Sequence, residues 1–143
     1  MDKKYEILDH PADLKIRAFG KDLPEVFVNM ALAIASEFRS SRRAERVPAF
    51  AKGAAEEIGI ESDDLASLLV DWLSEILYRG EINKKVYNDF EINEFSEEPF
   101  KIKAKIRGVA VESKNIDIKA VTYHELEIKK ISDYWEAIVV FDI

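Results

Sequence analysis

Cysteine is absent from the 143 residues of this sequence. Its absence excludes disulfide frameworks, catalysis by a thiolate, zinc-ribbon sites and iron–sulfur clusters. Long apolar runs are also absent: none reaches the roughly 18 residues of a membrane-spanning helix, and residues 1–6 lack the apolar core of a signal peptide. We therefore expect a cytoplasmic protein that does not contact a membrane.

Glycine and basic residues are both scarce. The five glycines stand apart from one another, so they cannot form a glycine-rich loop of the Walker or dinucleotide-binding kind. Lysine and arginine total 21 against 28 acidic residues, which gives a net charge of −7. Such a charge repels the phosphate backbone of nucleic acids, so we expect no tight direct binding of nucleic acid.

Apolar residues are abundant enough to build a core. They make up 48% of the chain, which excludes general disorder, and the length fits a single domain over residues 1–143. Residues 23–38 carry them at helical spacing, which predicts an amphipathic helix. Asp22 is its expected N-cap, and Glu25 is placed to complete a capping box.

A second amphipathic helix is predicted by the apolar stripe over residues 65–77. Ser62 is the expected cap at its beginning, and the acidic residues that follow favour the positive end of the helix dipole. Gly80 is expected to end this helix.

Elsewhere the apolar residues alternate with polar ones, the pattern of antiparallel strands with one solvated face. Residues 40–61 are less regular and are expected to hold one or two short strands. The sequence thus predicts an α+β fold, a mainly antiparallel sheet with two amphipathic helices packed on it. The clearer strands are expected at residues 14–19, 100–107, 116–121, 126–128 and 135–141.

Histidine occurs twice, and both residues are open to a structural interpretation. His124 follows a tyrosine in a strand-like pattern, where we expect a hydrogen-bonded structural residue. His10 lies in an Asp-His-Pro-Ala-Asp turn, where we expect it to position the loop. With no cysteine the usual zinc ligand sets cannot be completed, so the sequence predicts no histidine-based metal site.

Basic residues gather in two places. Four of them alternate along residues 101–107, which predicts a solvated sheet face paired with glutamates rather than an RNA-binding patch. The arginines at positions 39, 42, 43 and 46 follow the first helix and are a better candidate for a surface that binds a partner.

Carboxylates form the remaining candidate site. Asp13 lies in the turn after the first expected strand, Asp142 is next to last, and Ile143 adds an α-carboxylate. If the last strand lies beside the first, these three groups could converge, and they would repel one another unless a hard cation lay between them. The alternative is that Asp13 caps a turn and Asp142 is an exposed tail residue.

An ordered set of segments resembles the archease family over nearly the whole chain. The turn Asp-His-Pro-Ala-Asp at 9–13 is similar to the family's Asp-His-Thr-Ala-Asp, and Lys-Ala-Val-Thr-Tyr-His at 119–124 is similar to a family strand. The segments that carry the resemblance are residues 5–13, 17–27, 64–78, 118–124 and 141–143.

The resemblance implies a small α+β protein that is not itself an enzyme and takes part in tRNA splicing. Its implied role is to activate an RtcB-type tRNA ligase, by promoting guanylylation of the ligase's active-site histidine with GTP and by restoring multiple turnover. The implied partner is therefore a protein, the RtcB-type ligase.

The resemblance also implies a calcium-type metal site. Carried over to this sequence, its ligands are Asp13, Asp142 and Ile143, and its cofactor is Ca²⁺ or another hard divalent cation. Pro11 departs from the family pattern, because threonine is common there and proline lacks both a hydroxyl and an N–H group. This departure alters the groups around the metal in the turn.

Two other functions stay open. The protein could be a chaperone-like scaffold that binds proteins through the arginines at 39–46 without a metal. It could also be a small metal-dependent hydrolase that uses Asp13 and Asp142, but no general base or oxyanion donor is evident nearby.

Overall fold

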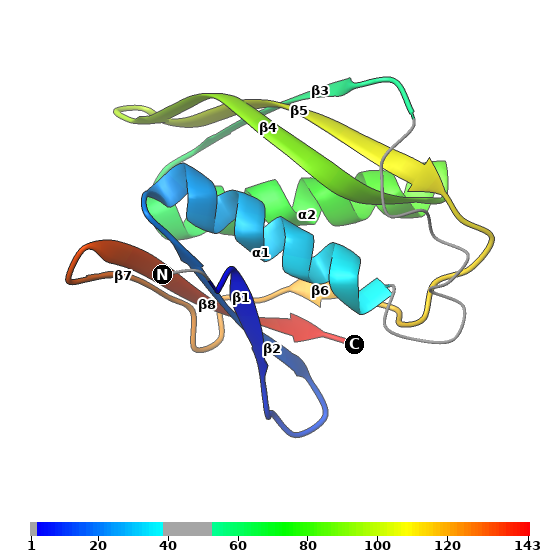
Figure 1. Ribbon diagram of the computed structural model, residues 1–143, viewed down its shortest axis with the longest axis horizontal. Helices are drawn as coiled ribbons and strands as arrows, with labels where there is room; N and C mark the ends of the chain where they lie inside the picture. The colour runs from blue at the N-terminus through cyan, green and yellow to red at the C-terminus, as the bar shows by residue number, and fades with distance from the viewer. Residues whose placement is uncertain (1–2, 39–52) are drawn as a thin grey trace.

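The computed structural model describes residues 3–38 and 53–143, which form two helices and eight strands within these ranges (Figure 1). Every strand pairing is antiparallel, as the alternating sequence pattern predicts. The helices are α1 (Leu23–Phe38) and α2 (Leu65–Asn83). The strands are β1 (Tyr5–Leu8), β2 (Leu14–Gly20), β3 (Glu56–Ser62), β4 (Lys85–Glu97), β5 (Phe100–Ala110), β6 (Ala120–Val121), β7 (Glu127–Ile131) and β8 (Tyr134–Asp142).

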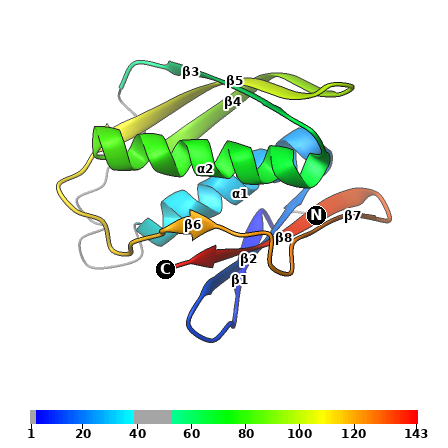
Figure 2. The same cartoon turned by 180° about the vertical axis from the view of Figure 1, so that it is seen from behind.

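The strands form two sheets rather than the single sheet expected. In the five-stranded sheet, β8 is central: β2 pairs with one of its edges, β6 and β7 pair with the other, and β1 lies outside β2. In the three-stranded sheet, β5 lies between β3 and β4. Figure 2 shows β6 beside the end of β8, close to the C-terminus.

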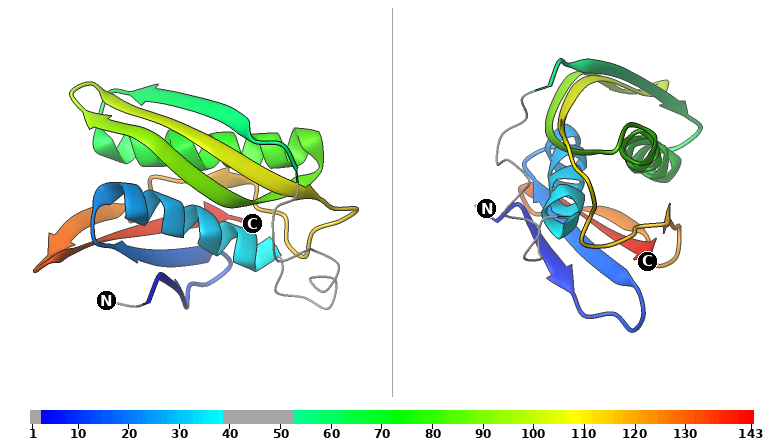
Figure 3. Two further views of the ribbon diagram at one scale, coloured as in Figure 1. Left: turned by 45° about the horizontal axis from the view of Figure 1, so that its top comes forward. Right: turned by 90° about the vertical axis from the view of Figure 1, so that its right-hand side faces the viewer.

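Both helices lie between the two sheets, which gives a layered α+β fold (Figure 3). The first helix contacts β2 and β8 on one side and β4 on the other, whereas α2 contacts all three strands of the smaller sheet and also β6. Apolar side chains from every layer meet in one core, and its largest fully buried members include Phe27, Trp72 and Phe141. The predicted α+β class is confirmed.

The first helix begins as its sequence predicts. Asp22 accepts a hydrogen bond from the main-chain N–H of Glu25 (3.0 Å), and the Glu25 side chain accepts one from the main-chain N–H of Lys21 (3.1 Å). These contacts satisfy N–H groups that have no partner within the helix.

The ends of the second helix differ from the prediction. Its N-cap is Asp64, which accepts a hydrogen bond from the Ser67 N–H (2.7 Å), and Ser62 instead donates its hydroxyl to Asp71. The Ser67 contact lowers the pKa of Asp64. The helix also passes through Gly80 and ends at Asn83, with Lys84 as its C-cap at a left-handed φ of 54°.

One strand prediction was wrong in its extent, and one strand was missed. The alternation over residues 116–121 yields a strand only at Ala120–Val121, since residues 116–119 follow an irregular path. The longest strand, β4, was not predicted, because its irregular pairing with β5 interrupts the alternation of buried residues in two places. Residues 56–62 do form a strand, and residues 39–52 lie outside the described part of the chain.

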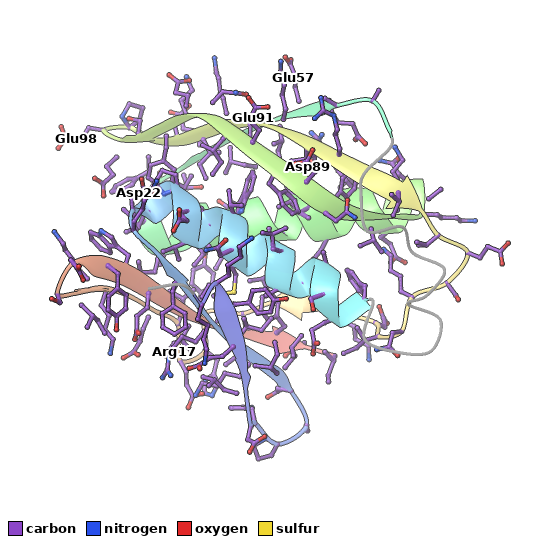
Figure 4. All side chains as sticks on the ribbon, in the orientation of Figure 1. Arg17, Asp22, Glu57, Asp89, Glu91 and Glu98 are labelled. Carbon is purple, nitrogen blue, oxygen red and sulfur yellow. The ribbon has the colours of Figure 1, made fainter. Side chains whose placement is uncertain are left out.

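The basic strand β5 is neutralised by acidic neighbours on the outer face of the smaller sheet. Arg107 lies 3.2 Å from Asp89, and Glu94 lies within 4.0 Å of both Lys101 and Lys103. Glu57 and Glu91 point outward from the same sheet (Figure 4). This arrangement agrees with a solvated, mixed-charge face.

Neither helix in the described ranges combines the length and apolar character that a membrane crossing needs.

Candidate metal-binding site

The pairing of β2 with β8 places two aspartates at neighbouring strand ends. Leu14 lies opposite Phe141, so the same register carried one residue further sets Asp13 opposite Asp142. Side chains alternate between faces of a sheet, and Leu14 and Phe141 are both buried. Asp13 and Asp142 therefore lie on the outer face, away from the helices.

The Asp142 side chain is exposed. Its main chain is held by residues 119 and 120, which lie on the edge of β8 opposite β2. Its carbonyl accepts a hydrogen bond from the Lys119 N–H (2.8 Å), and Ala120 lies opposite it in the register of β6. Ile143 is 42% exposed. In the part of the chain that the structure describes, the Asp142 carboxylate forms no ion pair or hydrogen bond, so its oxygens are open to a cation.

The turn between β1 and β2 brings a histidine against Asp13. Ala12 has a left-handed φ of 61° in this turn. The Nδ1 atom of His10 is buried and lies 3.3 Å from Oδ2 of Asp13, without the geometry of a hydrogen bond. The Nδ1 edge of the imidazole thus faces the Asp13 carboxylate, and Nε2 points away from Asp13.

The connection between β6 and β7 approaches the same place from the other edge of β8. Thr122 anchors it, because both its N–H and its hydroxyl donate to the carbonyl of Val140, at 3.1 and 2.8 Å. His124 and Glu125 follow in an exposed turn, and Glu125 has a left-handed φ of 56°. The strand predicted at His124 is thus a turn.

The two turns meet at Glu125. Its Oε2 atom lies 3.2 Å from Nε2 of His10 and 3.3 Å from Nζ of Lys15. The Lys15 ammonium holds the pKa of the Glu125 carboxyl below its usual value. The rings of His10 and His124 are 6.5 Å apart in an edge-to-face arrangement. Both turns lie on the side of the larger sheet that faces away from the helices (Figure 1).

Sequence reasoning found part of this geometry. It expected Asp13 and Asp142 to converge if the last strand lay beside the first, and the adjacency occurs through β2 rather than β1. It missed the cluster of His10, His124 and Glu125, because no spacing signal links positions more than a hundred residues apart. The arginines at 39–46 lie outside the described residues, so their role as a binding surface stays a prediction.

The donor atoms at this edge of the sheet are of two chemical kinds. Asp13, Asp142 and Ile143 can offer only oxygen, which suits a hard cation such as Ca²⁺ or Mg²⁺. His10, His124 and Glu125 offer two nitrogens and an oxygen, a set typical of borderline transition metals.

Comparison with known sequences identifies a family. The model of the "Archease protein family (MTH1598/TM1083)" matches residues 5–143. "Protein archease" of Methanosarcina barkeri is 42% identical over 147 aligned positions, which cover 99% of this chain and 97% of that protein. "Protein archease" of Pyrococcus abyssi is 34% identical and covers 99% of each chain.

Solved structures of related proteins share the fold. The solution structure of protein 1598 of Methanobacterium thermoautotrophicum has a TM-score of 0.76 and 28% identity, covering 97% of this chain and 98% of that one. The crystal structure of a Thermotoga maritima archease, described as a possible chaperone, has a TM-score of 0.63 and 19% identity, covering 100% of this chain and 98% of that one. At that identity the second likeness supports the fold alone.

Proposed function

This chain belongs to the archease family, and from that premise we propose that it activates an RtcB-type tRNA-splicing ligase. In this proposal the protein catalyses no reaction of its own. It promotes guanylylation of the ligase's active-site histidine with GTP and so allows the ligase to turn over repeatedly. The match to the family over residues 5–143 carries the proposal.

A hard divalent cation, Ca²⁺ in the first instance, belongs to the proposal. Asp13, Asp142 and an oxygen of Ile143 would hold it. The adjacency of Asp13 and Asp142 through the register of β2 and β8 supports this assignment, as does the open Asp142 carboxylate. When bound, the ion would neutralise two carboxylates that otherwise repel each other across the sheet.

The charge of the protein suits a protein partner that binds RNA and GTP. A ligase pocket that holds those anionic ligands has a basic rim, and a net charge of −7 favours docking on such a surface. The β1–β2 turn and the exposed end of β8 form the part of the described surface that we assign to this contact.

The test is a ligation assay with a cognate RtcB-type ligase, GTP, Mn²⁺ and RNA ends in large excess over ligase. With this protein present, we expect more ligase–GMP and many ligations per ligase molecule. The protein alone should leave the RNA unchanged. Ligation that stays at one turnover with the protein in excess would contradict the proposal.

Aspartate variants separate this function from that of a chaperone-like scaffold. Asp142→Asn should abolish activation, because the amide removes a charged ligand, whereas Asp133→Asn changes an exposed aspartate in the β7–β8 turn and should have no effect. A scaffold that needs no metal would retain its activity in Asp142→Asn and in the presence of a calcium chelator.

A further inference from the structure

Three side chains outside the proposed calcium site can each direct one ligand atom to a common point. These atoms, from His10, His124 and Glu125, all lie within 4.8 Å of one another. The residues come from two separate turns, and strand pairing through β8 brings those turns together. Other clusters of charged side chains, such as those around Glu56 and Glu136, are already neutralised by arginine and lysine.

We propose that His10, His124 and Glu125 form a second metal site, one that binds a divalent transition-metal ion of the Zn²⁺ class. Two imidazole nitrogens and one carboxylate are a recurrent three-ligand set for zinc, with water in the fourth position. Such a set needs no cysteine. Ca²⁺ prefers six or more oxygen ligands, so this site should discriminate against it.

The surroundings of His10 support a bound cation. The ring lies between two carboxylates, with Nδ1 facing Asp13 at 3.3 Å and Nε2 facing Glu125 at 3.2 Å. A neutral imidazole has a single N–H and can donate to only one of them. A metal ion between Nε2 and Glu125 would bind both groups, and the N–H at Nδ1 would then be free to donate to Asp13.

That arrangement matches a common feature of zinc sites, in which a ligating histidine donates its other N–H to a carboxylate. The contact fixes the tautomer of the ring and increases its basicity as a ligand. Asp13 would play this part for His10 after a small reorientation, since its carboxylate lies 3.3 Å from the buried Nδ1 atom, which has no hydrogen-bond partner in this structure. Its second oxygen would remain available to the proposed calcium site.

To bind the metal, the ligand atoms must come closer together, and the side chains that would move are exposed. Ligand atoms around a tetrahedral zinc ion are roughly 3.3 Å apart, so atoms now up to 4.8 Å apart must approach one another. His124 and Glu125 are both exposed, and rotation of their side chains can close this distance. Lys15 must also leave Glu125, because its ammonium lies 3.3 Å from the same carboxylate oxygen.

The test is calorimetric titration of Zn²⁺ into the full chain without a polyhistidine tag, in buffer saturated with Ca²⁺. We expect one zinc ion per molecule, with affinity reduced about tenfold or more in His10→Gln, His124→Gln and Glu125→Gln. Glu127→Gln changes an exposed neighbour on β7 and should bind zinc as the unaltered protein does. Lys15→Met should bind zinc more tightly, because it removes the competing ammonium.

The two metal sites can be judged separately. Asp142→Asn should keep its zinc affinity while losing calcium, so failure of the calcium site leaves the zinc proposal standing. Two outcomes would overturn the zinc site. One is that the protein binds no zinc ion with a Kd below about 100 μM, and the other is that the unaltered protein and His124→Gln bind zinc with equal affinity. In either case the contact between His10 and Glu125 is only the hydrogen bond of 3.2 Å seen in the structure.

Discussion

The indole Nε1–H of Trp72 donates a hydrogen bond of 3.1 Å to the main-chain carbonyl of Phe27. This contact joins α2 to α1 in the layer between the two sheets. Both side chains are fully buried, and each also packs edge-to-face against an aromatic ring of β4: Trp72 against Phe90, and Phe27 against Phe95. The two helices are therefore held to each other and to the smaller sheet by the same pair of residues.

Trp72→Phe should destabilise the protein by about 2 kcal/mol, because it removes a buried hydrogen bond and leaves a cavity in the core. Urea unfolding followed by circular dichroism measures the change. Trp135→Phe is the matched control, since Trp135 is only partly buried on β8. An equal loss in both variants would mean that the contact with Phe27 is not what stabilises the layer.

Gly108→Ala should destabilise the protein by about 1–3 kcal/mol through overpacking. A Cβ atom at this position would lie 2.8 Å from the Val86 carbonyl oxygen and 3.2 Å from Cα of Tyr87, and neither main-chain atom can move freely. Gly59→Ala meets nothing within 4 Å and should be neutral or stabilise the strand by about 0.5 kcal/mol. Thermal and urea unfolding of the pair test this contrast.

The stability of the fold should decrease in alkali because of Tyr87. Burial and the hydrogen bond from its hydroxyl to Glu56 (2.7 Å) raise the pKa of Tyr87 from 10.0 to about 12. The folded state favours the neutral phenol. The contribution of Tyr87 to the free energy of unfolding is therefore complete below pH 10 and is lost as the pH rises toward 12. It amounts to about 2–3 kcal/mol.

Tyr87→Phe isolates this effect, because the phenylalanine cannot ionise. The free energy of unfolding should fall more steeply between pH 10 and 12 in the unaltered protein than in the variant. Parallel pH profiles would show that Tyr87 ionises equally well in the folded and unfolded states.

Calcium affinity should depend on both aspartates at the strand ends. Asp13→Asn and Asp142→Asn should each weaken Ca²⁺ binding by about tenfold or more, since hard-cation affinity follows the number of charged ligands. Titration calorimetry measures this, with Asp133→Asn as the control. Equal affinity in all three variants would leave Asp142 an exposed strand-end residue, and Asp13 a partner of His10.

Direct binding to isolated tRNA should be weak, with a Kd no better than about 10⁻⁴–10⁻⁶ M at physiological salt. The net charge is −7, and Lys101, Lys103 and Arg107 of β5 form ion pairs with acidic residues. A gel-shift titration measures the affinity. A tight complex would contradict this expectation and would identify the outer face of β5 as a binding surface.

The sequence predicted the elements whose periodicity is regular. The first helix and its cap followed directly from the spacing of apolar residues after Asp22, and β5 followed from strict alternation. Partition into two sheets could not be predicted, because β2 and β8 pair across more than a hundred intervening residues. The proximity of Asp13 and Asp142 was anticipated only conditionally, as a consequence of such a pairing.

The cluster of His10, His124 and Glu125 shows why the rest escaped prediction. Each residue taken alone has an ordinary structural role, and their meeting depends on two turns with left-handed residues, Ala12 and Glu125. The irregular path of residues 116–119 was missed for a similar reason. Alternation is visible in the sequence, but the absence of a strand partner is not.

The central position of β8 sets the order in which this protein can fold during synthesis. Strands β2, β6 and β7 all pair with β8, and all three leave the ribosome before residues 134–142 do. Until β8 is synthesised, β2 lacks this partner strand and its apolar face belongs to no completed sheet. The elements β3, α2, β4 and β5 are contiguous in sequence and can assemble first. Such a high contact order favours slow completion of the larger sheet. Nascent chains stalled before residue 134 should therefore bind chaperones through β2.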